Sequence, residues 1–155
     1  QGDRGAFEQL VRRHSSAFEH FAPPDSLSHD ADDIAQAAFL AAWRRRATWR
    51  GGSFRGWVCA IAYREFLQAR RAAVPVVEAD DVGATQDTPA ERLDLSRAMQ
   101  ALEASERSAV ALCLGAGLSH TEAALVMGAP LGSVKSWVLR GRAKLQKALS
   151  AYEIA

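Results

Sequence analysis

The chain has 155 residues, of which 48% are hydrophobic and 24% are charged, which is the composition of a folded globular protein with one medium domain or two small ones. A disordered or fibrous protein is therefore excluded. The formal net charge is only +1, so a nucleic-acid surface would have to come from local clusters of charge rather than from an overall basic field.

Individual residue types further limit which kinds of protein and site the sequence is compatible with. Cys59 and Cys113 lie far apart within apolar helical stretches, where we expect small core residues rather than a disulfide or a metal pair. Without a run of 18 apolar residues or a leader peptide, the sequence predicts a cytoplasmic protein with no direct membrane insertion. The four histidines are scattered and no phosphate-binding glycine loop occurs, so we expect neither an enzyme nor a metal or cofactor site.

The first third of the chain predicts three helices. Over residues 3–21, apolar side chains from Phe7 to Phe18 recur at helical intervals, and two prolines follow. A second helix is expected over residues 30–46, which begin with aspartates and end with three arginines, the charge order that the helix dipole favours. A third is expected over residues 56–71.

The segment between the second and third helices, TWRGGSFR at residues 48–55, combines two aromatic residues and two arginines around a Gly-Gly pair. Aromatic rings stack on unpaired bases and guanidinium groups bind phosphates, so this pattern favours a single-strand nucleic-acid contact. The alternative is that Trp49 and Phe54 only fold the loop onto the core.

Charge is strongly segregated along the chain. Residues 40–71 hold eight arginines against one glutamate, whereas residues 78–94 hold six acidic residues against one arginine. Residues 74–88 also lose helical periodicity, which predicts an acidic linker. Beyond it we expect helices over residues 90–100 and 105–114, the latter capped by Ser105.

Residues 117–149 have the pattern of a helix-turn-helix. Ser119 is followed three residues later by Glu122, the capping pair of a helix start, and the segment from Gly128 to Pro130 ends that helix. The next helix carries five basic residues and no acidic one up to Leu149. This predicts a surface for phosphates and base edges, the alternative being an amphipathic helix with a chance charge bias.

Three of these blocks, in this order, resemble the extracytoplasmic-function group of the sigma-70 family. DADDIAQAAFLAAWR is similar to the region 2.2 helix, RGGSFRGWVCAIAYREFLQARR to regions 2.3 and 2.4, and GLSHTEAALVMGAPLGSVKSW with RGRAKL to region 4.2. The resemblance implies an all-α fold of two small helical domains, region 2 in residues 1–73 and region 4 in residues 93–155, joined by a flexible linker at 74–92.

The resemblance also implies a function. A sigma factor binds core RNA polymerase, at the β′ clamp helices and the β flap, and directs initiation at promoter DNA with −10 and −35 elements; a cognate anti-sigma factor, in some cases at the membrane, would control it. Three sets of residues match the family's contacts. They are Asp33, Gln36, Phe39, Leu40 and Trp43 for polymerase; Trp49, Arg50, Ser53, Phe54, Arg55, Tyr63, Arg64 and Arg71 for the −10 element; and Ser133, Lys135, Ser136, Trp137, Arg140 and Lys144 for the −35 element.

Within the −35 set, we expect Arg140 to read a guanine edge and the lysines to bind phosphates. Trp137 stands where the family commonly has arginine, and Tyr63 and Arg64 replace a usual Arg-Asn pair. These departures bear on the promoter sequence rather than on the class of function. Two alternatives remain. A sigma mimic that sequesters an anti-sigma factor would not need the basic stripes, and a dimeric helix-turn-helix regulator would not need the aromatic loop.

Overall fold

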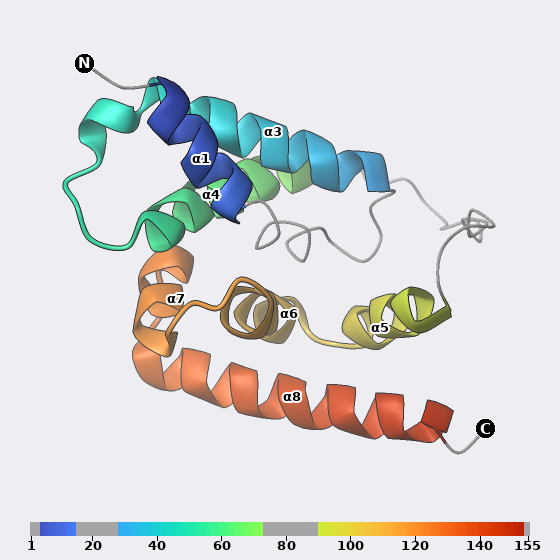
Figure 1. Cartoon of the computed structure of the whole chain (residues 1–155). Coiled ribbons are helices and arrows are strands. Elements are labelled where there is room, and N and C mark those ends of the chain that lie inside the picture. Colours follow the sequence, from blue (N-terminus) through green and yellow to red (C-terminus); the bar gives the residue numbers. More distant parts are fainter. Residues whose placement is uncertain (1–3, 15–27, 73–89, 154–155) are drawn as a thin grey trace.

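The computed structural model describes residues 4–14, 28–72 and 90–153, and all regular structure in these ranges is helical. Figure 1 shows the helices in two layers that lie one above the other. The first layer holds α1 (Arg4–His14), α3 (Ser28–Arg44) and α4 (Phe54–Ala72). The second holds α5 (Ala90–Gln100), α6 (Ala104–Val110), α7 (His120–Met127) and α8 (Leu131–Glu153). The predicted all-α fold is therefore confirmed.

The helices of the first layer follow the prediction with shifted ends. The helix predicted for residues 30–46 runs over Ser28–Arg44 and is followed by a short 3-10 turn, η1 (Arg46–Thr48). The helix predicted from residue 56 begins earlier, at Phe54, because the Ser53 hydroxyl accepts a hydrogen bond from the Gly56 amide at 3.1 Å and so caps its start. The predicted helix beyond residue 14 and the two prolines lie outside the described residues.

The helices before the helix-turn-helix agree with the prediction at α5 but not at α6. The prediction that Ser105 caps the next helix is wrong, because α6 begins at Ala104 and Glu103 is its N-cap. The Glu103 amide donates to the Glu106 carboxylate at 3.4 Å, the contact by which an N3 glutamate satisfies the N-cap amide in a capping box. The helix then widens into a π turn, η2 (Ala111–Gly115). Most of the predicted linker lies outside the described residues.

The helix-turn-helix has the predicted caps. The Ser119 hydroxyl accepts from the Glu122 amide at 3.1 Å, and the Glu122 carboxylate accepts from the Ser119 amide at 2.8 Å. Gly128 ends α7 with a left-handed φ of 62°, a conformation that glycine adopts without steric cost. Val134, Val138 and Leu145 form the buried face of α8, as their spacing predicted.

The core is shared between the two layers. A continuous cluster of buried side chains runs from Ala38 and Val58 in the first layer to Leu112, Ala123 and Val134 in the second. Within this core α4 packs against both α3 and α7, while α6 packs against α8. The two predicted domains therefore form one packed body in this structure.

The cysteines contribute to this core as free thiols. Cys59 is completely buried, and burial raises the pKa of its thiol to about 12. Burial also raises the pKa of the half-buried Cys113. A thiol that stays protonated is a poor nucleophile and a poor metal ligand, so Cys59 is the small core residue that the sequence predicted.

The close approach of α6 to α8 generates a first prediction. A Cβ at Gly141 would lie 2.7 Å from Val110 Cγ2, so Gly141→Ala should destabilise the protein by about 1 to 3 kcal/mol through overpacking, although alanine is the better helix former. Urea unfolding measures this loss. A Cβ at Gly132 in the same helix would lie within 4 Å of no other atom, so Gly132→Ala should not lower the free energy of unfolding. If Val110→Ala does not reduce the cost of Gly141→Ala, the close contact is not its cause.

Candidate nucleic-acid interface

The loop at residues 49–53 connects η1 to α4 and depends on two glycines. Gly51 and Gly52 have φ values of 90° and 85°, which side chains other than glycine rarely adopt. Arg50 and Ser53 are exposed on either side of this turn. The Gly-Gly pair thus permits the turn between η1 and α4.

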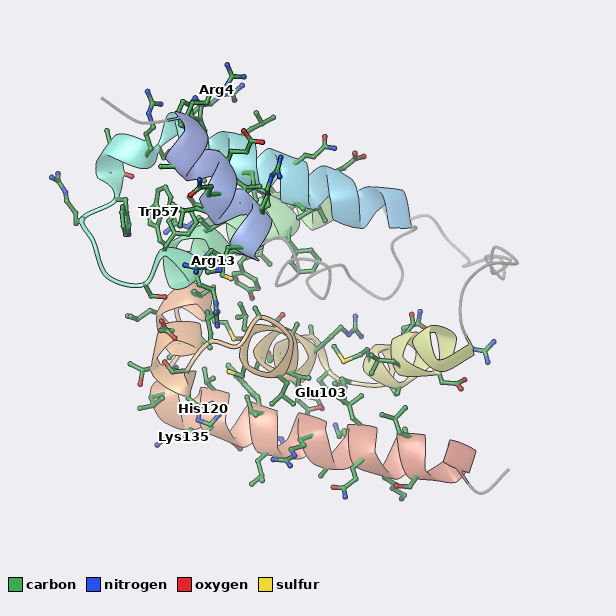
Figure 2. The ribbon with its side chains drawn as sticks, in the orientation of Figure 1. Arg4, Arg13, Trp57, Glu103, His120 and Lys135 are labelled. Carbon is green, nitrogen blue, oxygen red and sulfur yellow. The ribbon has the colours of Figure 1, made fainter. Side chains whose placement is uncertain are left out.

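Phe54 holds this loop to the first layer. It is half-buried, and its ring meets those of four neighbours at centroid distances of 5.6 to 6.4 Å: Phe7, His14, Trp49 and Trp57. Figure 2 shows Trp57 among the side chains of this layer. Trp49 meets Phe54 edge to face and remains 40% exposed. Phe54 therefore fits the alternative interpretation, a side chain that folds the loop onto the core, whereas Trp49 presents ring surface to solvent.

The other side chains assigned to the −10 element differ in exposure. Arg55, Arg64 and Arg71 are exposed on α4, and their spacing puts Arg64 and Arg71 on one side of the helix and Arg55 on the other. Tyr63 is half-buried, packs against the shared core, and has its ring 6.3 Å from that of Phe66. Of the residues assigned to the −10 element, Tyr63 is therefore one that lies partly in the core.

The residues assigned to polymerase binding also divide into exposed and half-buried side chains. Asp33, Gln36 and Leu40 are exposed on α3 at spacings of three and four residues, so they share one face of the helix. Phe39 is half-buried against the core, and the Trp43 ring packs edge to face on Phe7 at 5.0 Å. Phe39 and Trp43 therefore contribute largely to packing, and the exposed part of this set is Asp33, Gln36 and Leu40.

The recognition helix α8 exposes a narrower surface than its sequence predicted. Lys135 and Arg140 are exposed, and Figure 2 shows Lys135 near the N-terminal end of the helix. Ser133, Ser136 and Trp137 are half-buried, and Trp137 packs against the core. Leu139, which the sequence analysis did not select, is 72% exposed one turn after Lys135. Its helical position, outside the buried face of Val134 and Val138, agrees with this exposure.

Arg140 and Lys144 both bind one buried carboxylate. Arg140 Nε donates to Glu106 Oε1 at 3.1 Å, and Lys144 Nζ donates to Glu106 Oε2 at 2.7 Å. The hydrogen bond from Lys144, followed by that from Arg140, holds the pKa of Glu106 below its ordinary value against the opposing effect of burial. Arg140 also donates from Nη1 to the Ser136 hydroxyl at 3.2 Å.

The starts of α4 and α7 meet at a polar junction. Arg55 Nη1 donates to the Gly117 carbonyl at 3.4 Å, which lies just before α7. The Glu122 carboxylate accepts from the Ser119 amide and also interacts with the Ser53 hydroxyl and the Arg55 charge, and these contacts lower its pKa. Two residues of the predicted −10 surface, Ser53 and Arg55, are therefore in contact with the helix-turn-helix.

Metal and membrane features are absent from the helices and loops that the structure covers. Among those residues, no three histidine, cysteine or acidic side chains are grouped closely enough to hold a metal ion. Within the same ranges, no helix combines the length and hydropathy that crossing a bilayer would require.

The fold thus defines a class: an all-α protein with a basic helix-turn-helix and a second basic surface beside an aromatic loop. Two family descriptions match the chain, Sigma-70 region 2 over residues 7–74 and Sigma-70, region 4 over residues 92–145. The chain belongs to the sigma-70 family, in its extracytoplasmic-function group, and is an RNA polymerase sigma factor.

Several characterised proteins resemble the whole chain. The RNA polymerase sigma factor NccH of Alcaligenes xylosoxydans xylosoxydans is 34% identical, across 99% of this chain and 92% of the relative. The ECF RNA polymerase sigma-E factor of Escherichia coli K12 is 32% identical, across 92% and 85%. The structure of CnrH in complex with the cytosolic domain of CnrY is 30% identical, with a TM-score of 0.70 over 97% of this chain and 91% of that chain.

The capping pair at the helix-turn-helix generates a pH prediction. Because the folded protein lowers the pKa of Glu122, its carboxylate stabilises the fold above the ordinary value of 4.5, and this contribution is lost as the pH falls through the folded pKa. Glu122→Gln should therefore lower the free energy of unfolding at pH 7, and the difference from the parent should shrink below pH 4.5.

Unfolding in urea at a series of pH values measures the difference. Glu8→Gln is the matched control, because Glu8 forms an exposed ion pair with Arg12 that should contribute little to stability. A gap between parent and Glu122→Gln that is the same at pH 7 and pH 3 would show that the carboxylate charge is not what stabilises this helix start.

Proposed function

We propose that this sigma factor binds core RNA polymerase and places it at promoters by contacting a −35 element with α8 and a −10 element with the loop and α4. The observation that carries the proposal is the pair of exposed basic surfaces, each beside a side chain suited to bases: Trp49 in the loop and Leu139 on α8. A fold of this kind needs no cofactor for either contact.

The proposed −10 contact uses the loop and the exposed face of α4. The open face of Trp49 can stack on an unpaired base of a melted strand, a contact that offsets the few kcal/mol required to unstack a base. In this proposal the exposed arginines of the loop and α4 supply positive charge for phosphates of that strand; they are Arg50, Arg55, Arg64 and Arg71. Ser53, Phe54 and Tyr63 support this surface, since Ser53 caps α4 and the two rings fix the loop and helix to the core.

The proposed −35 contact uses the N-terminal half of α8 in the major groove. Lys135 supplies a phosphate contact and Arg140 a guanidinium for a guanine edge. Leu139 adds an apolar surface suited to a thymine methyl group. The proposed contact also includes three half-buried residues, Ser133, Ser136 and Trp137. Its last member, Lys144, is exposed but paired with Glu106.

The proposed polymerase contact is the exposed face of α3. Asp33 and Gln36 supply polar groups, and Leu40 is a large apolar side chain with more than half its surface open to solvent. An exposed leucine beside polar residues suits a partner surface such as the β′ clamp helices. Phe39 and Trp43 lie behind this face and hold it in place. The β flap is the partner that we propose for the region 4 helices.

We also propose that an anti-sigma factor controls this chain in the cytoplasm. Support comes from CnrH, which is similar over nearly the whole chain and whose structure was solved with the cytosolic domain of CnrY. Such a partner would cover the polymerase and DNA surfaces.

The packed arrangement implies that the two layers separate during initiation. Elements named −10 and −35 are about 25 base pairs apart, which is about 85 Å along the duplex. A compact body of this chain length has a diameter of only about 40 Å. Both elements can therefore be bound at once only if the contact between α4 and α7 opens.

The two alternative functions fit the exposed surfaces less well. A mimic that only sequesters an anti-sigma factor has no use for solvent-exposed arginines along both α4 and α8. A dimeric regulator that reads duplex DNA has no use for an open tryptophan in a Gly-Gly loop.

Run-off transcription tests the proposed function. Core RNA polymerase with the full chain should initiate from a subset of a promoter library, whereas core polymerase alone should not select that subset. Recovered templates should share two boxes separated by a fixed spacing. Equal initiation with and without the chain would favour the mimic or the dimeric regulator.

A substitution in the loop tests base capture separately. Trp49→Ala should impair strand opening more than initial promoter binding, because the ring contacts DNA only after bases unstack; stacking of this kind contributes about 1 to 3 kcal/mol per base. Permanganate reactivity of thymines in the −10 region measures opening, and gel retention on ice measures initial binding. Identical footprints for parent and Trp49→Ala would rule out the stacking role.

A further inference from the structure

Glu106 is a buried charge at the start of α6, where its carboxylate accepts from the Glu103 amide and also faces α8. Its side chain is 1% exposed beneath α8, where Gly141 permits the helix to pass close to its Cβ and backbone. Burying a carboxylate is unfavourable unless the charge is paired and its oxygens are hydrogen-bonded. Both pairing partners, Arg140 and Lys144, come from the recognition helix.

The pairing occupies one edge of the Arg140 guanidinium. Of its five N–H donors, Nε–H points to Glu106 and one Nη1 hydrogen points to Ser136. Three donors remain, at least one on each terminal nitrogen, and these can form the paired contact to the O6 and N7 acceptors of guanine. The Arg140 side chain is 52% exposed, so these donors remain accessible.

The same carboxylate is paired with the Lys144 ammonium. The ammonium lies 2.7 Å from Glu106 Oε2, and a phosphate that attracted it away would leave a buried carboxylate with one partner fewer. Glu106 remains ionised at physiological pH because its pKa is lowered. One buried negative charge therefore offsets part of the positive charge of a helix that carries no acidic residue of its own up to Leu149.

We propose that Glu106 is a specificity-determining positioning residue for duplex DNA: it fixes one edge of Arg140 for base readout and suppresses phosphate binding by Lys144. This inference rests on the proposed −35 contact of α8. The geometry thereby favours recognition of a matching sequence over general attraction to the DNA backbone, since phosphate contacts add affinity without sequence choice.

Glu106→Gln tests the proposal, because glutamine keeps the size of the side chain and one acceptor but removes the charge. The full chain is titrated by fluorescence anisotropy against a −35 duplex selected by the parent from a random library and against a scrambled duplex. The variant should bind the scrambled duplex several-fold more tightly, with a salt slope steeper by about 1, the counterion release expected for one added phosphate contact. The preference for the selected duplex should fall about tenfold, the order expected for loss of one paired base contact.

Glu8→Gln is the control, since it removes the same charge from an exposed position on α1, away from α6 and α8. It should change neither the preference nor the slope by a comparable amount. An unchanged preference in Glu106→Gln overturns the positioning role, even if the proposed function holds. A parent that prefers no duplex overturns this inference together with the −35 contact.

A second pair of variants keeps the test valid if Glu106→Gln fails to fold. Lys144→Gln should barely change affinity for the scrambled duplex, because its ammonium is already bound to Glu106, whereas Lys147→Gln, exposed one turn later on the same helix, should weaken it. Equal losses in the two variants would show that Lys144 is an ordinary phosphate contact and would overturn the proposal.

Discussion

The packing of α4 against α7 is the contact on which the arrangement of the whole protein depends. It joins the buried side chains of the two layers into one core, and it is sealed at its edge by the interactions of Arg55 and Ser53 with Gly117 and Glu122. Both proposed DNA surfaces are therefore held on one body. The contact has a polar edge and a core rich in alanine, which bury less apolar area per residue than leucine or phenylalanine would. Such a contact is suited to open when polymerase and promoter offer competing surfaces.

The buried charge of Glu106 in the second layer affects how α8 meets DNA. A helix with five basic residues would bind any polyanion, and the buried Glu106 reduces this tendency by pairing with two of them. Gly141 makes the pairing possible, because a larger residue would push α8 away from Val110 and from the carboxylate. Packing and recognition are thus coupled through one close approach between α6 and α8.

Local patterns in the sequence predicted the helices and their caps well. The Ser119 and Glu122 pair, the break at Gly128 and the buried spacing of Val134 and Val138 all involve residues within two turns of each other. Side-chain burial was harder to predict because it depends on distant partners. Trp137 and Phe39 were half-buried by other helices, and Arg140 and Lys144 paired with a residue more than 30 positions earlier. No periodicity reveals such a contact, and an apolar residue such as Leu139 on an amphipathic helix gives no signal in the sequence that separates a DNA contact from a core contact.

The distance between the two layers tests this account most directly. Fluorophores carried by non-natural amino acids at positions 68 and 146, exposed on α4 and α8, report it by single-molecule energy transfer. The account predicts one short distance in the free chain, within a body about 40 Å across, and a distance longer by tens of ångströms in the complex with core polymerase and promoter DNA. A long or broadly spread distance in the free chain, or the same short distance in the complex, would contradict it.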